Sequence, residues 1–258
     1  MYYSNEIAKR TKRLLSRLLT LGRARSPDEN DYQLLNNSDT PEDNGWKVRS
    51  AAERQHQAFQ SLLHEVRAGN PRIDFVAAAK AIQFTGLSDP LLIEIGCGSG
   101  YYCEALPLLL QHPLRYIGVD FSPAMVSLAH ATYEQVPFLA GDGCRLPLRD
   151  SACDILLSGT SLMHIAEYRL AISESVRASR EWCIFHTVPL IKSRATTLMH
   201  KLAYGQRVVE VIFNQSELES IFRENGLVTE HLFESLPYDV SSVLGEPSWT
   251  ATYLCRKI

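Results

Sequence analysis

The sequence predicts an α/β fold in which a doubly wound, mostly parallel sheet is covered by helices on both faces. From residue 90 onward, short apolar runs alternate with stretches of helical periodicity. The first apolar run, at 91–95, leads directly into a glycine-rich turn and then a helix. Such alternation is typical of parallel strands joined by crossover helices. The preceding residues lack it, so a separate region is expected before the sheet.

The elements of the sheet region can be assigned in chain order. Strands are predicted at 91–95, 115–120, 137–142, 153–159, 181–188, 227–234 and 249–256. Helices are predicted at about 100–111, after the cap pair Ser122-Pro123, at about 166–179, and after a capping box of Ser216 and Glu219. Only a hairpin-length segment separates the last two strands, so one of them is expected to be antiparallel.

Two helices are predicted to form a cap over residues 46–88. Ser50 and Glu53 have the S-x-x-E spacing of a capping box, which satisfies two backbone donors at a helix start. The Asn70-Pro71 pair has the cap residue and the proline expected where a second helix begins. A helical cap is therefore expected to precede the sheet.

The N-terminal residues differ sharply in character from the rest. Residues 1–25 carry seven Lys or Arg against one acid, with leucines at helical spacing, and are predicted to form a basic amphipathic helix. Three interpretations stay open: docking on this chain or a partner subunit, contact with an anionic membrane surface, or a targeting peptide. Residues 26–45 are predicted to be a flexible acidic linker. The sheet domain occupies 89–258, with a lid-like insertion at 189–213.

Composition excludes several classes of protein. The net charge of −3 gives no basic surplus for nucleic acid, so no such partner is expected. The six cysteines are scattered and predict reduced thiols in a cytoplasmic protein. No cluster has metal-ligand spacing, so no metal is expected. No apolar run approaches the ~20 residues needed to span a bilayer, which leaves only a peripheral membrane contact through residues 1–25.

The glycine turn indicates a nucleoside ligand. Glycines 96, 98 and 100 let the backbone turn tightly and let a ligand approach it, and Asp120 ends the next strand, where a carboxylate can hold a ribose. Tyr101 occupies the position of the third glycine of a dinucleotide fingerprint. Glu94 would repel a pyrophosphate, by ~1 kcal/mol in water and more when buried. These charges favour S-adenosylmethionine (SAM), a cation without phosphate.

The order and spacing of these motifs resemble a known family. E-x-G-x-G-x-G after the first strand, an acid ending the second, and G-D-G at 141–143 resemble the class I SAM-dependent methyltransferases, with the type 11 methyltransferase domain of the small-molecule branch most similar. The resemblance covers about residues 88–190. It implies a Rossmann-like, seven-stranded sheet whose last strand is antiparallel. The family's frequent Pro-Gly-Gly turn is replaced here by SRE at 179–181, which puts the close subfamily in doubt.

The resemblance also implies roles for individual residues. Glu94 would reach the SAM ammonium, Asp120 the ribose, Phe121 the adenine face and Asp142 the adenine amino group. The residues implied to surround SAM are Glu94, Gly96, Cys97, Gly98, Ser99, Gly100, Tyr101, Asp120, Phe121, Asp142, Gly143, Cys144, Ser158 and Gly159. A turn-forming Asp-Gly is the plainer interpretation of Asp142.

His164 is the candidate catalytic base. It follows the fourth strand, where this fold faces the transferred methyl group, and imidazole titrates in the required range. The alternative is a structural histidine at a helix start. His186, within the fifth strand, is predicted to be buried instead. Methyl transfer needs a base only when the acceptor must lose a proton.

Acceptor recognition is assigned to the cap and the insertion. The candidates are Trp46, Gln55, His56, Lys201, Tyr204 and Arg207. The cations predict either a solvated basic face or a cover for an acidic acceptor.

The sequence therefore predicts a SAM-dependent methyltransferase acting on a small or medium-sized molecule. A noncatalytic SAM-binding scaffold and an NAD(P)-dependent oxidoreductase are the alternatives, although the Tyr-x-x-x-Lys pair of one oxidoreductase class is absent.

Overall fold

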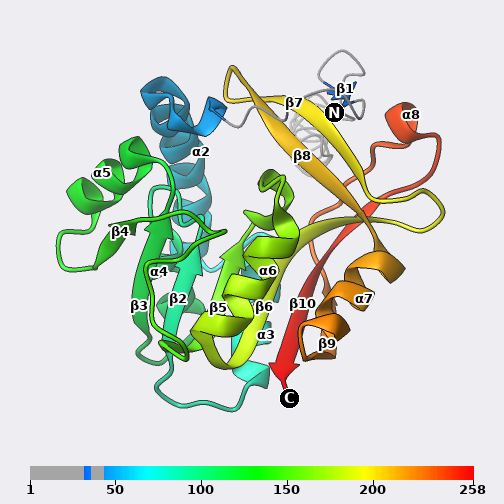
Figure 1. Cartoon of the computed structure of the whole chain (residues 1–258). Helices are drawn as coiled ribbons and strands as arrows, with labels where there is room; N and C mark the ends of the chain where they lie inside the picture. The colour runs from blue at the N-terminus through cyan, green and yellow to red at the C-terminus, as the bar shows by residue number, and fades with distance from the viewer. Residues whose placement is uncertain (1–31, 36–43) are drawn as a thin grey trace, which may run out of the picture.

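The computed structural model describes residues 32–35 and 44–258 (Figure 1). Its centre is a seven-stranded sheet in the order β4-β3-β2-β5-β6-β10-β9. The strands are β2 (Leu91–Ile95), β3 (Arg115–Asp120), β4 (Phe138–Ala140), β5 (Cys153–Gly159), β6 (Ser179–Ile191), β9 (Leu227–Glu234) and β10 (Trp249–Lys257). β10 pairs antiparallel with both β6 and β9, whereas the other pairs in this series are parallel. The predicted doubly wound sheet with an antiparallel last strand is confirmed.

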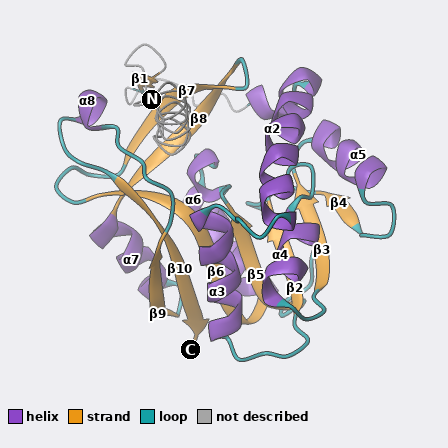
Figure 2. Cartoon of the chain, turned by 180° about the vertical axis from the view of Figure 1, so that it is seen from behind, coloured by secondary structure: helices purple, strands orange, loops and turns teal. Residues whose placement is uncertain are grey.

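Helices cover both faces of this sheet. Figure 2 shows α2 (Arg49–Arg67), α3 (Ile73–Phe84), α4 (Tyr102–Leu110) and α5 (Pro123–Thr132) on the near face. On the other face, seen in front in Figure 1, lie α6 (Tyr168–Ala178) and α7 (Gln215–Glu224). The sheet is buried between these layers, and the side chains of Leu92, Ile155 and Leu157 have no exposed surface. Burial on both faces explains why the central strands are continuous apolar runs.

Three further strands extend the sheet beyond the seven. They are β1 (Tyr32–Leu34), β7 (Thr197–Ala203) and β8 (Gln206–Asn214). β7 and β8 form an antiparallel hairpin, β1 pairs with β7, and the end of β8 joins the end of β6 in parallel. The insertion predicted at 189–213 is thus mostly a β-hairpin that leans over the sheet (Figure 1). β1 falls within the segment predicted to be a flexible linker.

The helical cap consists of a short 3-10 helix, η2 (Gly45–Lys47), followed by α2 and α3. The predicted capping box of Ser50 and Glu53 is wrong, because α2 begins at Arg49 and its N-cap is Val48. The second helix begins at Ile73, later than the Asn70-Pro71 pair predicts. The basic helix predicted at 1–25 lies outside the described residues.

Two small elements complete the chain, the 3-10 helix η3 (Leu162–His164) and α8 (Ser241–Leu244). No helix in the described ranges combines the length and the apolar character needed to cross a bilayer.

Candidate functional site

A cavity of about 590 Å³ lies at the carboxyl ends of the central strands. Its floor comes from the turns that follow β2, β3, β4 and β5, and its roof from the cap and the β7–β8 hairpin. In open α/β sheets this edge is where ligands bind. The volume is typical of a small-molecule site.

The glycine turn after β2 cannot accept side chains. Gly96, Gly98 and Gly100 have φ values of 68°, 53° and 83°, in the left-handed region that favours glycine. A Cβ on Gly96 would collide with Ser161, and one on Gly98 would lie 2.7 Å from Oε1 of Gln55. The missing side chains therefore make room for Ser161 and Gln55, and both glycines also line the cavity.

Asp120 joins this turn to the end of β3. One carboxylate oxygen accepts the backbone N–H of Gly98 and the other that of Ser122, both at 2.8 Å. Burial raises the pKa of Asp120 to about 6, against the lowering effect of these two hydrogen bonds. Asp120 lines the cavity, so an ionised carboxylate there can still accept hydroxyl groups from a ligand.

Glu94 is buried beneath the cavity rather than in its wall. Its Oε2 accepts a hydrogen bond from the Tyr116 hydroxyl, while its Oε1 has no hydrogen-bond partner among the described residues. Burial raises the pKa of Glu94 well above its usual range. A Cβ on Gly159 would overlap the Glu94 carboxylate, which explains a glycine at the end of β5.

The adenine-side candidates take different positions. Phe121, Asp142 and Gly143 line the cavity, but Cys144 lines an adjoining hollow that shares Phe121 and Asp142 with it. The Asp142 carboxylate accepts the backbone N–H of Cys144 at 2.8 Å, so it also stabilises its own turn. The same carboxylate can therefore stabilise its turn and still contact the adenine amino group, so the two interpretations of Asp142 are compatible.

Several predicted residues lie behind the wall. The structure does not bring Cys97, Ser99, Gly100 or Ser158 to the cavity surface, although Tyr101 and Gly159 reach it. The Ser158 hydroxyl is 2.9 Å from that of Ser161, which donates to the Ile95 carbonyl at 2.7 Å. Ser158 thus supports the wall through Ser161.

His164 lies at the end of η3, and one of its two ring nitrogens makes a hydrogen bond. Its Nδ1 is 2.7 Å from the Val209 carbonyl on β8, and because a carbonyl only accepts, Nδ1 carries the proton. The Nε2 lone pair is then free to act as a base. Burial lowers the pKa of His164, against opposing effects of Glu210 and the Val209 carbonyl, so the ring is neutral near pH 7. Its ring centre lies 4.9 Å from that of Trp46.

Four of the six acceptor candidates reach the roof of the cavity, namely Trp46, Gln55, Lys201 and Tyr204. The other two lie elsewhere. Nε2 of His56 is 3.3 Å from Nε2 of Gln60 along α2, and Arg207 is exposed and donates to Gln33 at 2.7 Å.

Sequence reasoning missed three charged contributors. Arg72 lines the cavity and is held by a two-pronged hydrogen bond to the buried carboxylate of Asp74, at 2.8 and 2.7 Å. The fully buried Glu210 lies 3.2 Å from the Lys201 ammonium. Lone charged residues carry no motif, although an acid inside the apolar run of β8 is a signal of a buried partner.

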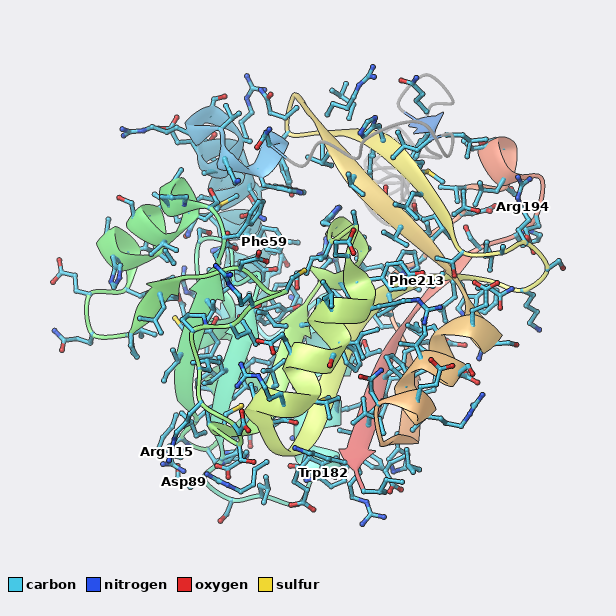
Figure 3. All side chains as sticks on the ribbon, in the orientation of Figure 1. Phe59, Asp89, Arg115, Trp182, Arg194 and Phe213 are labelled. Carbon is cyan, nitrogen blue, oxygen red and sulfur yellow. The ribbon has the colours of Figure 1, made fainter. Side chains whose placement is uncertain are left out.

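Aromatic packing closes the cap side of the cavity. The rings of Phe59 and Tyr101 are stacked with centres 3.8 Å apart, and both residues line the cavity. Figure 3 shows Phe59 between α2 and the sheet, far from Asp89 and Arg115 at the opposite ends of the strands. Those two form an ion pair of 3.3 Å. Within the described ranges, no group of three or more His, Cys, Asp or Glu could hold a metal ion.

Comparison with known proteins identifies the central region. Residues 93–184 match the model of a family described as "Methyltransferase domain". A probable S-adenosylmethionine-dependent methyltransferase of Mycolicibacterium smegmatis is 30% identical over 94 residues, which cover 36% of this chain and 35% of that protein. A demethylmenaquinone methyltransferase of Lactiplantibacillus plantarum is 23% identical over 172 residues, covering 56% and 73%.

The fold is also shared with a solved structure. An S-adenosylmethionine-dependent methyltransferase from Clostridium acetobutylicum superposes with a TM-score of 0.54 at 11% identity, covering 79% of this chain and 99% of that one. The matched family covers the glycine turn, Asp120, Asp142 and His164. Residues 93–184 of this chain therefore match a methyltransferase domain, and over this part the chain is similar to SAM-dependent methyltransferases.

Proposed function

We propose that the protein transfers the methyl group of SAM to a small or medium-sized acceptor that carries an anionic group. The observation that carries this proposal is the shared cavity. One wall holds the glycine turn and Asp120, and the same space is lined by His164 and two cations, Lys201 and Arg72. A cofactor and an acceptor bound there would face one another.

The residues present fit SAM. Gly96 and Gly98 bring the backbone of the turn to the cavity, and Asp120 offers carboxylate oxygens where a ribose would lie. Phe121 would face the adenine and Asp142 its amino group. The buried Oε1 of Glu94 lacks a hydrogen-bond partner in the described structure and suits a positively charged ligand.

The same carboxylates disfavour the oxidoreductase alternative. Glu94 and Asp120 are both buried beside the glycine turn. A pyrophosphate bound over the ionised Asp120 carboxylate would place like charges together where solvent screens them poorly. This repulsion supports a nucleoside without phosphate.

His164 is proposed to act as the base. SAM, when bound, supplies a methyl carbon activated by its sulfonium. His164, neutral and with Nδ1–H fixed on Val209, presents Nε2 to accept the proton that an acceptor O–H or N–H loses. The roof formed by Trp46 and Tyr204 would limit the access of water to the reacting groups.

The charges of the roof support an anionic acceptor. Burial raises the pKa of the Tyr204 hydroxyl, whereas Arg72 and Lys201 both act to lower it. Arg72 and Lys201 thus lie near the Tyr204 hydroxyl, each paired with a buried carboxylate, Asp74 or Glu210. Among the described residues, the carboxylates that line the cavity are Asp120 and Asp142, and both lie on the cofactor side. An acceptor carboxylate, phosphate or acidic phenol would suit this distribution.

Two measurements test the proposal. Calorimetry should detect binding of SAM and its demethylated product S-adenosylhomocysteine, and no binding of NAD(P). Incubation with radiolabelled SAM and a metabolite extract should then label a small anionic product. Binding without any labelled product would favour the noncatalytic scaffold, whereas tight NAD(P) binding without SAM binding would overturn the proposal.

The cellular location and the partners of the protein are also proposed rather than shown. All six cysteines are free thiols, which supports the predicted cytoplasmic location. A peripheral membrane or partner contact through residues 1–25 and the absence of a nucleic-acid partner stay predictions.

A further inference from the structure

The Gln55 side chain, a predicted acceptor contact, also faces the glycine turn. It projects from α2 onto the glycine turn, where its Oε1 lies 2.7 Å from the position that a Cβ on Gly98 would take. The residue lines the cavity. Its Oε1 is buried and has no hydrogen-bond partner within the described part of the chain.

An amide oxygen that is buried without a partner lowers stability, so it calls for an explanation. A ligand is the natural partner here, because the carboxamide borders the cavity. A carboxamide has two donors and two acceptor lone pairs, and can therefore bind an anion and a cation at once.

Two adjacent side chains of α2, Arg54 and Gln55, point to different parts of the site. Arg54, one residue earlier on α2, reaches the hairpin and donates to the Tyr204 carbonyl at 2.9 Å. Gln55 is about 100° further round the helix and faces the glycine turn instead. Gln55 therefore approaches Gly98 at the position of a Cβ, whereas Asp120 accepts the Gly98 N–H.

We propose that the Gln55 carboxamide binds the amino-acid end of SAM. This inference rests on the proposed function. Asp120 takes the ribose, so the part of the cofactor that lies over Gly98 is its methionine portion. The Gln55 oxygen accepts from the α-ammonium, and the amide N–H donates to the α-carboxylate. The carboxamide thus offers an acceptor and a donor to the two charges of the zwitterion.

One consequence concerns the cap. Its helix α2 supplies a cofactor ligand as well as the acceptor roof, so SAM binding fixes the cap against the sheet domain. Ligands that lack the amino-acid part lose this link. The cap is then part of the selection of the cofactor.

The test compares two ligands that differ only in the amino-acid part. S-adenosylhomocysteine carries it, whereas 5′-methylthioadenosine retains the nucleoside and thioether alone. Calorimetry on the full chain should show that Gln55→Ala binds S-adenosylhomocysteine roughly 10- to 100-fold more weakly, since bonds to charged groups are lost. Affinity for 5′-methylthioadenosine should change less than about twofold. Gln57→Ala, an exposed residue of the same helix, is the matched control.

The outcomes separate the two proposals. If the parent protein binds S-adenosylhomocysteine and Gln55→Ala binds it equally well, the role of Gln55 is wrong and the proposed function stands. An equal loss for both ligands also overturns the inference. If the parent binds neither ligand, the proposed function itself fails. Gln55→Met, which keeps the length of the side chain, replaces the alanine variant if that variant does not fold.

Discussion

The two halves of the cavity are built in different ways. The cofactor half comes from consecutive strand ends and their turns, at Gly96–Gly98, Asp120–Phe121, Asp142–Gly143 and Gly159. The acceptor half is assembled from the cap, from Lys201 and Tyr204 on the hairpin, and from Leu236. Its ties join distant segments, such as Arg54 to Tyr204, 150 residues apart.

This difference explains why one half has a motif and the other has none. In the cofactor half, backbone hydrogen bonds hold the turn in place. The amides of Gly96 and Cys97, for example, donate to the Val119 carbonyl at 2.8 and 3.1 Å. Backbone recognition fixes turns, and turns need glycine at set positions. In the acceptor half, side chains from unrelated segments meet, and their identity can vary with the acceptor.

The largest effect expected is on turnover, where the two halves meet. His164→Asn should lower kcat roughly 10²- to 10³-fold, because the base is lost, and should leave affinity for S-adenosylhomocysteine within about twofold. Steady-state kinetics and calorimetry measure the two quantities. His112→Asn, far from the cavity, is the control. A parent-like kcat would show that the acceptor needs no base from His164.

The cofactor half is expected to depend on Asp120. Asp120→Ala should weaken S-adenosylhomocysteine binding roughly 10- to 100-fold, because charged hydrogen bonds to the ribose are lost. In the parent, affinity should also fall as the pH drops below about 6, where the carboxyl gains a proton and loses one acceptor site. Calorimetry between pH 5 and 8 tests both points. An affinity that stays level across this range would contradict the ribose contact.

His186 of β6 is buried among hydroxyl groups. His186 Nε2 is 2.8 Å from the Tyr102 hydroxyl and 3.0 Å from that of Thr187, which contacts Ser235 at 2.9 Å. Burial lowers the pKa of His186 to about 4. The unfolded chain therefore binds this proton more tightly, and stability should be lost as the pH falls from about 6.5 toward 4.

The expected loss from His186 is about 2 kcal/mol between pH 7 and pH 5. Denaturant unfolding at several pH values measures it. His186→Gln should reduce the pH dependence, with the remainder coming from His56 and His164, whose pKa values burial also lowers. An unchanged slope in the variant would assign the effect to other groups.

The smallest effect is expected on acceptor affinity. Lys201→Met alone would leave Glu210 buried without its cation, so the double variant with Glu210→Gln is the one to assay. Its KM for an anionic acceptor should rise about tenfold, with little change in SAM binding. Arg207→Met, whose side chain points away from the cavity, should change KM less than about twofold. Equal effects in both variants would mean that the cations act only through overall charge.

Local signals predicted the strands well and the helix starts unevenly. The strands at 91–95, 115–120, 153–159 and 227–234 coincide with β2, β3, β5 and β9. Ser122 caps α5 as predicted, since its hydroxyl accepts the Met125 N–H. The capping box of Ser216 and Glu219 is wrong, because the cap of α7 is Asn214.

Asn214 shows why such a cap escapes local reasoning. Its Oδ1 accepts the Glu217 N–H, and its Nδ2 donates to the carbonyls of Lys192 and Arg194. The residue ends β8 and begins α7 at once, so its place depends on a loop twenty residues away. The hairpin, by contrast, had a local signal in the β-branched run VVEVI at 208–212, followed by Phe213.

The site was predictable where its geometry follows from the backbone. The glycine turn and the acid ending β3 could be located from spacing alone, because sheet topology brings strand ends together. Arg72 and Glu210 could not, since each depends on a partner from a fold not yet known. The same limit applies to His56 and Arg207, whose helix and strand positions could be inferred but not the face they occupy.

Ser122 stands at a junction of both halves. Its backbone N–H donates to Asp120, its hydroxyl accepts from Met125, and that hydroxyl donates to the Trp46 carbonyl at 2.8 Å. A ligand that shifts Asp120 would therefore act, through Ser122, on the backbone of Trp46, whose indole lies beside His164. Linkage is reciprocal: if bound cofactor changes the affinity for the acceptor by some factor, bound acceptor must change the affinity for the cofactor by the same factor. The order in which cofactor and acceptor are added would then change how fast the ternary complex forms, but not how much of it is present at equilibrium.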